Sequence, residues 1–255
     1  MIVLGIETSC DETAAAIVSS EGDIIAETVL SQLDDHRPYG GVVPEVAARA
    51  HLEYVDVVVS KTMAKADLSF HELDAVAATG GPGLIGGVIV GIMTAKAIAA
   101  SCNLPFLAIN HMEGHALSAR LSKAGKVPFP YLLLLISGGH CQLLNVKGCG
   151  KYKRLGTTID DALGEAFDKT ARLLKLGYPG GPQIEKLAQS GNEDAYDLPK
   201  PLIHENNSYF SFSGLKTSVA QLVHKQKKLT SKIKKDIAAS FQKTIGDIIK
   251  VKTKN

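Results

Sequence analysis

The stretch "IVLGIETSCDETAAAIVSSEGDIIAETVLS", residues 2–31, contains three short apolar segments separated by the polar turns "SCDE" and "EGD". Each segment has the length and the small or β-branched content of a strand, which predicts a tight meander of three strands. The hydrophobic period then becomes helical over residues 44–66, where Pro44 suits the first turn of a helix. The fold therefore opens as three strands followed by a helix.

The rest of the first half alternates strands with helices. "DAVAATG" (74–80) and "PFLAI" (105–109) are strand candidates, and each precedes a predicted helix. The first of these helices covers residues 84–100, and the second begins at "NHMEGHALSARL", residues 110–121. The predicted order of the first half is βββαβαβα.

The second half repeats this opening. "YLLLLIS", the turn "GG" and "HCQLLNV" repeat the first strand, turn and strand, and "KRLGTT" precedes a predicted helix at 160–177. Two copies of one unit predict an α/β protein with the actin-like ATPase (ASKHA) fold, in which two similar lobes flank a nucleotide cleft. The connector "KAGKVPFP" (123–130) predicts lobes at 1–125 and 126–255.

The second copy does not finish. Helices are predicted at 181–190, 213–228 and 231–250, but no further pair of apolar strands follows residue 160. We therefore expect an incomplete second lobe and a chain that is shortened at its C-terminus.

Composition points to a folded protein of the cytoplasm. The chain has 45% hydrophobic and 21% charged residues, and its four cysteines form neither a CxxC pair nor a disulfide framework. No signal peptide is recognisable. Residues 84–100 are apolar, but Lys96 interrupts a run that is short for a membrane span, so a buried helix and no membrane association are expected.

Charge is balanced overall but not along the chain. The net charge is +2, whereas ten lysines between Lys225 and Lys254 are accompanied by only Asp236 and Asp247. A solvated helix face is the favoured interpretation of such a run, and an RNA-facing stripe is the alternative.

His111 and His115 have the spacing of a shared metal site. Four residues apart on a helix, they lie about 40° apart around the axis and project from one face. A histidine pair that only forms hydrogen bonds is the common alternative, but these two follow a strand in an α/β unit, where ligand-binding loops gather. Glu113 lies about 200° from His111, so the HExxH arrangement of a zinc protease is missing. Iron or zinc would need further ligands from elsewhere.

Glycine-rich turns in the second half suit an anionic or nucleotide ligand. "LISGGH" (135–140) ends a strand in two glycines, whose backbone N–H groups are accessible; a plain β-turn is the alternative. "GEAFDKTARLLKLGYPGGP" (164–182) places Asp168 before a glycine-opened helix that carries Glu185. Both acids are equally explained as ordinary exposed helix residues.

A third glycine-rich stretch, "TGGPGLIGGVIVG" (79–91), lacks the signature of a phosphate loop. Gly83, Gly87 and Gly91 share one helical face and predict the close approach of another element. That element belongs either to the same fold or to a second subunit, and the sequence does not favour one over the other.

Eight segments together resemble the tRNA threonylcarbamoyladenosine transferases, the bacterial TsaD and archaeal Kae1 family. In chain order they are "GIETSCDETAAAIV", "GGVVPEVAARAH", "TGGPGLIGGVIVG", "NHMEGHALSARL", "LISGGHCQL", "GEAFDKTARLL", "YPGGP" and "FSFSGLKT". The resemblance extends from residue 1 to about residue 250. It implies transfer of the threonylcarbamoyl group from threonylcarbamoyl-AMP to N6 of the adenosine 3′ of the anticodon (A37), in tRNAs that read codons starting with A.

The resemblance also assigns residues and partners. His111 and His115 correspond to metal ligands, with iron (Fe²⁺) the first expectation and zinc the second. The residues that correspond to contacts with the nucleotide substrate are Leu135, Ile136, Ser137, Gly138, Gly139, Asp168, Gly181 and Glu185. A TsaB-like paralogue is expected on the glycine-rich helix, and a TsaE-like ATPase joins them. The family continues to an asparagine and to a "TDN"-like aspartate of the metal site, and this chain is expected to end before both.

Two other functions remain open at this point. A catalytically impaired remnant would keep the subunit-pairing helix as a binding or scaffold subunit. An actin-like kinase would phosphorylate a small acceptor with ATP. Metal binding by the histidine pair favours the transferase.

Overall fold

Five strands form one mixed sheet in the first half of the chain: β1 (Ile2–Glu7), β2 (Glu12–Ser19), β3 (Ile24–Ser31), β4 (Ala75–Gly81) and β5 (Phe106–Asn110). The order across the sheet is β3-β2-β1-β4-β5, in which β1, β4 and β5 are parallel and β2 is antiparallel to both neighbours. The predicted meander is confirmed. Parallel strands end at the same edge, so the residues that follow β1, β4 and β5 are brought together.

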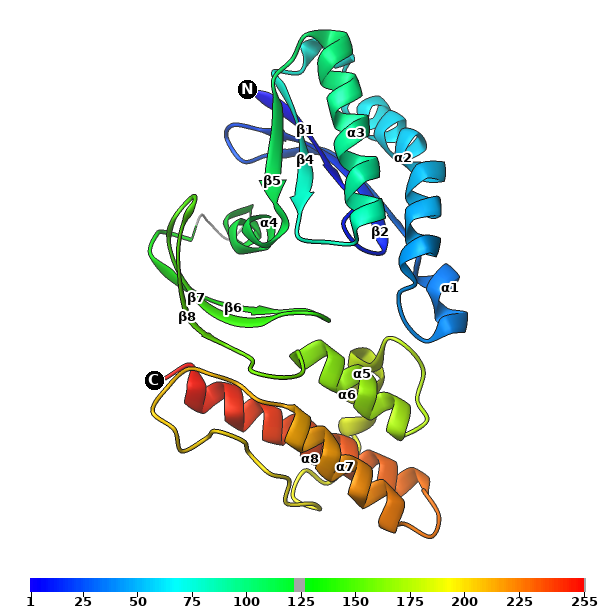
Figure 1. Cartoon of the computed structure of the whole chain (residues 1–255), viewed down its shortest axis with the longest axis vertical. Helices are drawn as coiled ribbons and strands as arrows, with labels where there is room; N and C mark the ends of the chain where they lie inside the picture. Colours follow the sequence, from blue (N-terminus) through cyan, green and yellow to red (C-terminus); the bar gives the residue numbers. More distant parts are fainter. Residues whose placement is uncertain (122–126, 255) are drawn as a thin grey trace. The chain divides into compact units, whose positions relative to one another are not determined.

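The structure is a computed structural model that describes residues 1–121 and 127–254. It divides into two compact units, Met1–Val127 and Pro128–Asn255. Residues 123–126 of the predicted connector lie outside the described residues. Each unit combines one sheet with helices, as an α/β fold requires (Figure 1).

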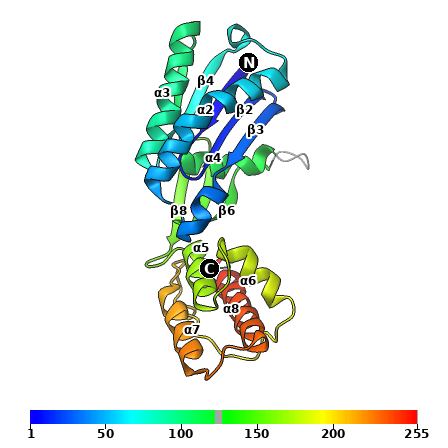
Figure 2. The same cartoon turned by 90° about the vertical axis from the view of Figure 1, so that its right-hand side faces the viewer.

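Two long helices, α2 (Pro44–Ala66) and α3 (Ile85–Cys102), cover one face of the first sheet (Figures 1 and 2). The core between sheet and helices is aliphatic; it includes Leu4, Ile17, Val58, Val76 and Ala95. The smaller helices of this unit are α1 (Leu33–His36), α4 (His111–Ser118) and the 3₁₀ turns Arg37–Tyr39, Phe70–Glu72 and Ala119–Leu121.

The glycine-bearing face of α3 packs inside its own unit. A Cβ on Gly87 would lie 2.2 Å from the carbonyl oxygen of Thr8, and one on Gly91 would lie 2.2 Å from Thr8 Oγ1. A Cβ on Gly83 would lie 2.6 Å from Ser9. Of the two alternatives that the sequence left open, the structure therefore favours close approach within the fold.

The prediction that α3 is a buried helix is wrong for its other face. Ile85, Ile89 and Met93 are 74%, 52% and 59% exposed, because α3 lies in the outer layer and only its glycine and alanine side meets the sheet. By length and composition alone, α3 is the one helix in the described part of the chain that could cross a membrane.

The second unit pairs β6 (Tyr131–Ile136), β7 (Cys141–Gly148) and β8 (Lys151–Thr157) in an antiparallel sheet of that order. Its helices are α5 (Leu163–Leu173), α6 (Gly180–Ala188), α7 (Ser213–Lys225) and α8 (Ser231–Lys252). Phe210, Phe212 and Phe241 are fully buried at its centre. Within residues 128–254 the structure contains no strands beyond these three.

The lysines of α8 do not form one continuous solvated face. Lys252 is fully buried, and its Nζ donates to the carbonyl oxygens of Glu205 and Asn207 at 2.9 and 3.0 Å. Lys243 pairs with Glu193 and Asp194. The favoured interpretation of a solvated helix face is therefore wrong for Lys252, because three oxygen atoms of Glu205 and Asn207 replace water around its Nζ. Lys243 remains partly exposed beside its two carboxylate partners.

Candidate functional site

The two histidines of the predicted metal site face one another at the start of α4. This helix begins directly after β5, and Asn110 caps it by accepting a hydrogen bond from the backbone N–H of Met112 (2.9 Å). The Nε2 atoms of His111 and His115 are 3.0 Å apart, with the ring planes at 83°. Two nitrogens bound to one tetrahedral zinc at about 2.0–2.1 Å would lie about 3.4 Å apart. The observed 3.0 Å is shorter than this and is also a hydrogen-bond distance, so the two rings are close enough to share an ion but are equally well placed to form a hydrogen bond with each other.

Glu7 reaches the opposite nitrogen of His111. His111 Nδ1 lies 3.1 Å from Ser9 Oγ and 3.4 Å from Glu7 Oε2. The same carboxylate accepts hydrogen bonds from the backbone N–H of Ser9 and from the hydroxyl of Thr79. Glu7 ends β1, Thr79 lies near the end of β4 and His111 follows β5, so the parallel order of these strands gathers the group.

Electrostatics keeps Glu7 ionised. Burial acts to raise the pKa of this carboxyl group, but hydrogen bonds from Ser9 and Thr79 outweigh burial and leave the pKa below its ordinary value. A carboxylate at this position can accept a hydrogen bond from the Nδ1–H group of His111, which leaves the lone pair of the neutral ring on Nε2. The geometry directs the Nε2 atom of His111 toward His115. In the described residues, no group of three or more His, Cys, Asp or Glu side chains is arranged to hold a metal.

A buried chain of hydrogen bonds holds the turn that follows β1. The backbone N–H of Val43 donates to His36 Nδ1, so the proton of this imidazole is on Nε2, which faces Gln32 Oε1 at 3.3 Å. Gln32 Nε2 in turn lies 3.1 Å from His51 Nδ1. The Nε2–H group of His51 donates to the carbonyl oxygen of Cys10 (3.1 Å).

This chain of hydrogen bonds requires neutral histidines. The side chains of Gln32, His36 and His51 are fully buried, and burial lowers the pKa of His51. Thr13 Oγ1 adds a contact to His51 Nδ1 at 2.8 Å, and Thr8 Oγ1 donates to the carbonyl of Gly87. The turn between β1 and β2 is therefore fixed from both α2 and α3.

The predicted nucleotide loop of the second unit is largely bare backbone. Ser137 Oγ accepts hydrogen bonds from the N–H groups of Gly139 (3.3 Å) and His140 (3.0 Å). Gly138 and Gly139 are exposed, and a Cβ added to either would meet nothing within 4 Å. Leu135 is buried while Ile136 is 43% exposed.

The start of α5 supports this loop. The N–H of Gly164 donates to the carbonyl of Ser137 (3.2 Å), and a Cβ on Gly164 would lie 2.9 Å from Gly138 Cα. The loop is therefore attached to the helix that carries Asp168.

Asp168 holds the beginning of α6. Its Oδ1 accepts the N–H of Gly180 at 2.7 Å, whereas the neighbouring Lys169 pairs with Asp161 and Glu165. The alternative interpretation of Asp168 is an exposed acid paired with Lys169 or Arg172. Lys169 is not its partner, and Asp168 is partly buried and accepts a hydrogen bond from an N–H group at the start of α6. A Cβ on Gly181 would meet nothing within 4 Å, and Glu185 is exposed one turn further along α6.

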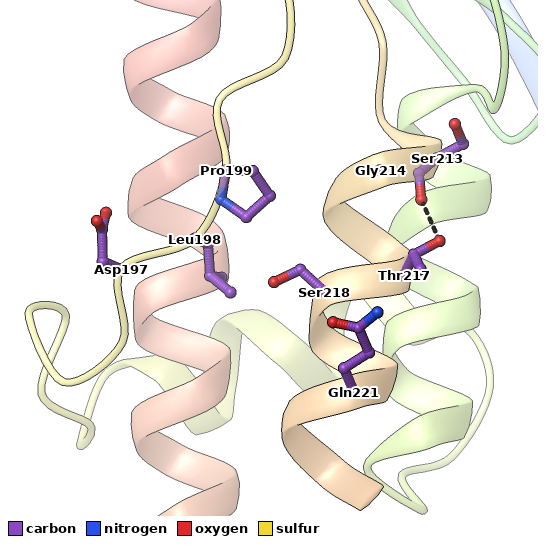
Figure 3. A pocket seen from close by; sticks show the side chains of 8 residues that line it. All are labelled: Asp197, Leu198, Pro199, Ser213, Gly214, Thr217, Ser218 and Gln221. Atoms are coloured by element: carbon purple, nitrogen blue, oxygen red, sulfur yellow. Dashed lines mark hydrogen bonds between the residues drawn. The ribbon is translucent and has the colours of Figure 1, made fainter. Parts of the chain in front are cut away.

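A separate cavity of about 630 Å³ lies in the second unit (Figure 3). It is lined by Asp197, Leu198, Pro199, Ser213, Gly214, Thr217, Ser218 and Gln221, from α7 and the segment that faces it. The residues predicted to bind the nucleotide substrate are not among these lining residues. Nearby, Asp160 accepts hydrogen bonds from the backbone N–H of Phe212 and the hydroxyls of Ser211 and Ser213, which attaches the start of α7 to the end of β8.

The sequence matches the family model described as TsaD, tRNA N6-adenosine threonylcarbamoyltransferase, over residues 23–255. The chain belongs to the TsaD family. Two relatives named tRNA N6-adenosine threonylcarbamoyltransferase illustrate the similarity. The protein from Paramagnetospirillum magneticum is 58% identical over 97% of this chain and 71% of its own length, and that from Brucella canis is 59% identical over 98% and 70%.

Solved structures show the fold of this TsaD family member. Component A of (R)-2-hydroxyglutaryl-CoA dehydratase from Acidaminococcus fermentans superposes with a TM-score of 0.55 at 14% identity, covering 100% of this chain and 78% of that one. The activator of 2-hydroxyisocaproyl-CoA dehydratase from Clostridium difficile gives 0.52 at 12% identity, with 100% and 74% covered. The predicted actin-like α/β fold is confirmed.

Sequence reasoning identified both histidines but missed Glu7 and Thr79. The structure brings His111 and His115 together within the first unit. In the second unit, the start of α5 contacts Ser137 and Gly138, and the same helix carries Asp168. Asp168 in turn accepts a hydrogen bond from the N–H of Gly180. The signal that would have found Glu7 is its place at the end of a strand predicted to neighbour the histidine strand, since strand ends in α/β sheets collect ligand-binding side chains.

Proposed function

We propose that this chain is the transferase that moves the threonylcarbamoyl group from threonylcarbamoyl-AMP to N6 of adenosine 37 in tRNAs reading codons that start with A. The observation that carries the proposal is the pair of converging Nε2 atoms in a TsaD family chain that is 58–59% identical to relatives named for this activity. Family membership supports this function over a kinase and over a scaffold without catalysis.

A divalent metal bound by His111 and His115 is part of this proposal, with iron favoured and zinc the alternative. The donor set fits: two imidazole nitrogens at 3.0 Å face a common point, and His111 has a carboxylate on its far nitrogen. Imidazole ligands suit both metals, and the ion would need further ligands from outside this pair of histidines. When bound, the ion supplies Lewis-acid polarisation of the carbamoyl carbonyl.

Glu7 and Ser9 have a positioning role in this proposal. They hold His111 with Nδ1 protonated, so that Nε2 keeps its lone pair for the ion. Thr79 fixes Glu7 in turn. The turn after β1 holds Glu7 and Ser9 in place. Its backbone is restricted by the hydrogen bond from His51 to Cys10 and by the close approach of Gly87 to Thr8.

The adenylate part of the substrate is assigned to the second unit. We expect the N–H groups of Gly138 and Gly139 to approach its phosphate, since no side chain covers them. Leu135, Ile136 and Ser137 shape the same loop. Asp168, Gly181 and Glu185 lie at the start of α6, where free N–H donors and a carboxylate suit the ribose and its phosphate.

The reaction forms one bond and breaks one. The N6 amine of adenosine attacks the carbamoyl carbon, a new C–N bond forms, and the C–O bond to the phosphate of AMP breaks. N6 loses a proton, and AMP leaves with the electron pair of the broken bond. The contribution of the chain is to bind and orient the acyl carbon, the leaving phosphate and N6 relative to one another, so that the attack no longer depends on a chance encounter in solution.

Partners follow from the same proposal. The substrates are tRNA and threonylcarbamoyl-AMP, and the expected companions are a TsaB-like paralogue and a TsaE-like ATPase, in the cytoplasm. The exposed face of α3 with Ile85, Ile89 and Met93 is the surface we assign to the paralogue, because large exposed apolar patches mark protein interaction sites.

Metal content and tRNA modification test the proposal together. The purified chain is loaded anaerobically with Fe²⁺ or with Zn²⁺, and bound metal is measured per chain beside a double variant, His111→Ala with His115→Ala. The matched control is His71→Ala, a histidine in the Phe70–Glu72 turn away from the pair. We expect about one metal in wild type and control and at least about a hundredfold weaker binding in the double variant. Full tRNA modification by the double variant, assayed with threonylcarbamoyl-AMP and the partner proteins, would sink the proposal.

A further inference from the structure

Six lysines surround the connection between α7 and α8, and they define what we call the lysine patch: Lys225, Lys227, Lys228, Lys232, Lys234 and Lys235. Residues 224–235 contain no acidic residue. Among the described residues, none of the six lysines forms an ion pair, in contrast to Lys200, Lys216 and Lys243 of the same unit. The patch is therefore a concentrated positive surface at one end of the second unit (Figure 1). Asp236, the next residue of α8, accepts a hydrogen bond from the backbone N–H of Asn192.

The lysines of the patch differ in exposure, and Lys234 and Lys235 are partly buried. Four of the lysines are exposed: Lys225, Lys227, Lys228 and Lys232. On α8, Ile233 and Ile237 face the apolar core. A rotation of about 100° per residue places Lys232 and Lys235 on the opposite side of the helix.

The position of two lysines is unfavourable for the helix that carries them. The first turn of α8 contains no acidic residue, and Lys232 and Lys234 lie at the end where the helix dipole is positive. Positive side chains there repel the dipole, whereas Lys225 at the end of α7 interacts with it favourably. The arrangement at α8 adds the lysine charges to the free N–H groups of the helix start, which strengthens attraction of an anion.

The composition of the patch favours nucleic acid over a membrane. A membrane-surface helix needs exposed large apolar side chains beside its basic residues. Within residues 224–235 the large apolar residues are Leu229 and Ile233, and both pack against the core of the unit. A polar surface with several clustered cations instead suits the phosphate backbone of RNA.

We propose that the lysine patch contacts the phosphate backbone of the tRNA substrate. This inference rests on the proposed function, which supplies tRNA as the RNA. The contacts are independent of base sequence and set the affinity of the complex and its dependence on salt. The patch has no part in holding the metal or the adenylate, so its loss weakens tRNA binding without altering either.

The test is tRNA binding as a function of salt concentration, with the full chain loaded with metal. The variant Lys232→Glu/Lys235→Glu removes two cations from the patch, and Lys61→Glu/Lys186→Glu makes the same change in net charge at exposed lysines elsewhere. Each lost phosphate contact reduces the slope of log K against log[salt] by about 0.7–0.9. We expect the patch variant to lose a slope of about 1.4–1.8 and at least about tenfold in affinity at 0.1 M salt. The control keeps the wild-type slope.

Thermal unfolding distinguishes a binding role from a structural one. Glutamate at position 232, in the first turn of α8, interacts favourably with the helix dipole, so the patch variant should unfold at the same temperature as wild type or a higher one. Weaker tRNA binding by a variant that is at least as stable and keeps its metal supports the proposal. Equal weakening in patch and control variants, or unchanged binding in both, overturns it.

Two further outcomes separate this inference from its alternatives. If the patch variant loses binding to vesicles of anionic phospholipid while tRNA binding stays at the wild-type level, the surface is a membrane contact and the proposal is wrong. If wild type and both variants alike fail to bind tRNA at low salt, the proposed function itself fails, together with the assignment of the patch. If wild type binds tRNA and the patch variant binds it with the same affinity and salt dependence, the role of the lysine patch is wrong but the proposed function stands.

Discussion

The two units each contain a turn between their first two strands, and the two turns are built in opposite ways. In the first unit, the turn from Thr8 to Glu12 is held by buried side chains of α2 and by the glycine face of α3. In the second unit, the turn from Ser137 to His140 is held mainly by one hydroxyl and by the start of α5. An added Cβ would clash at Gly87 beside the first turn but would meet nothing at Gly138 or Gly139 in the second.

This difference matches the chemistry proposed for each turn. A metal site needs imidazole and carboxylate groups fixed to within a fraction of an ångström, which requires a rigid support. A phosphate-binding loop needs backbone N–H groups that a ligand can approach, which requires the absence of side chains. The internal repeat supplied one strand–turn–strand framework twice, and the residues around each turn determine which ligand it suits.

The largest expected effect is on stability at the first turn. Gly87→Ala places a methyl group 2.2 Å from the carbonyl oxygen of Thr8 and 2.9 Å from the ring of His51. Neither neighbour is the end of a flexible side chain, so we expect a loss of about 3 kcal/mol in the free energy of unfolding. Gly139→Ala is the matched change in the second turn and should cost less than about 0.5 kcal/mol. Urea unfolding measures both. Similar values for the two variants would contradict the contrast between the turns.

The sequence predicted the elements around these turns but not what braces them. Short apolar segments bounded by polar turns were sufficient to predict the strands. The spacing of His111 and His115 was sufficient to predict that they share one face of a helix. The contact between Glu7 and His111 joins residues 104 positions apart and depends on β4 lying between β1 and β5, which no local pattern specifies. The same limit applies to His36 and His51, which look like ordinary polar residues until the fold buries them. Lys252 shows the same limit for a charged residue. The sequence predicts a solvated lysine, but the fold buries it and supplies hydrogen-bond acceptors from residues more than 40 positions away.

A smaller effect is expected on metal affinity when the contact between Glu7 and Nδ1 of His111 is weakened. Glu7→Gln keeps the size of the side chain but replaces one acceptor oxygen by an NH₂ donor, so His111, Ser9 and Thr79 no longer share a carboxylate. Changes of this kind typically cost 10–100-fold in metal affinity, and we expect a loss of about that size. Competition with a chelator of known affinity measures it without any assay of catalysis.

The control for this prediction lies on the histidine helix itself. Glu113 is one residue after Met112 in α4 and lies about 200° around the helix from His111. Glu113→Gln therefore removes the same charge from the same helix without touching the far nitrogen of His111. Equal affinities for the Glu7→Gln variant and for wild type would show that the carboxylate does not orient the metal ligand.

The smallest expected effect is a pH dependence confined to the first turn. Burial lowers the pKa of His51 below its ordinary value of 6.5, so the unfolded chain binds a proton at mildly acidic pH more readily than the folded one. Stability contributed by the neutral imidazole is therefore fully present above pH 6.5 and falls as the pH decreases below that value. The Ser137 turn is braced by a hydroxyl, which does not titrate. We expect the unfolding temperature of the first unit to fall by a few degrees between pH 7.5 and pH 5.5, and His51→Gln, which lacks a titrating group, to reduce this fall. Because the other seven histidines remain, an unchanged pH dependence in His51→Gln would show that the buried hydrogen-bond chain is not the part of the first turn that responds to acid.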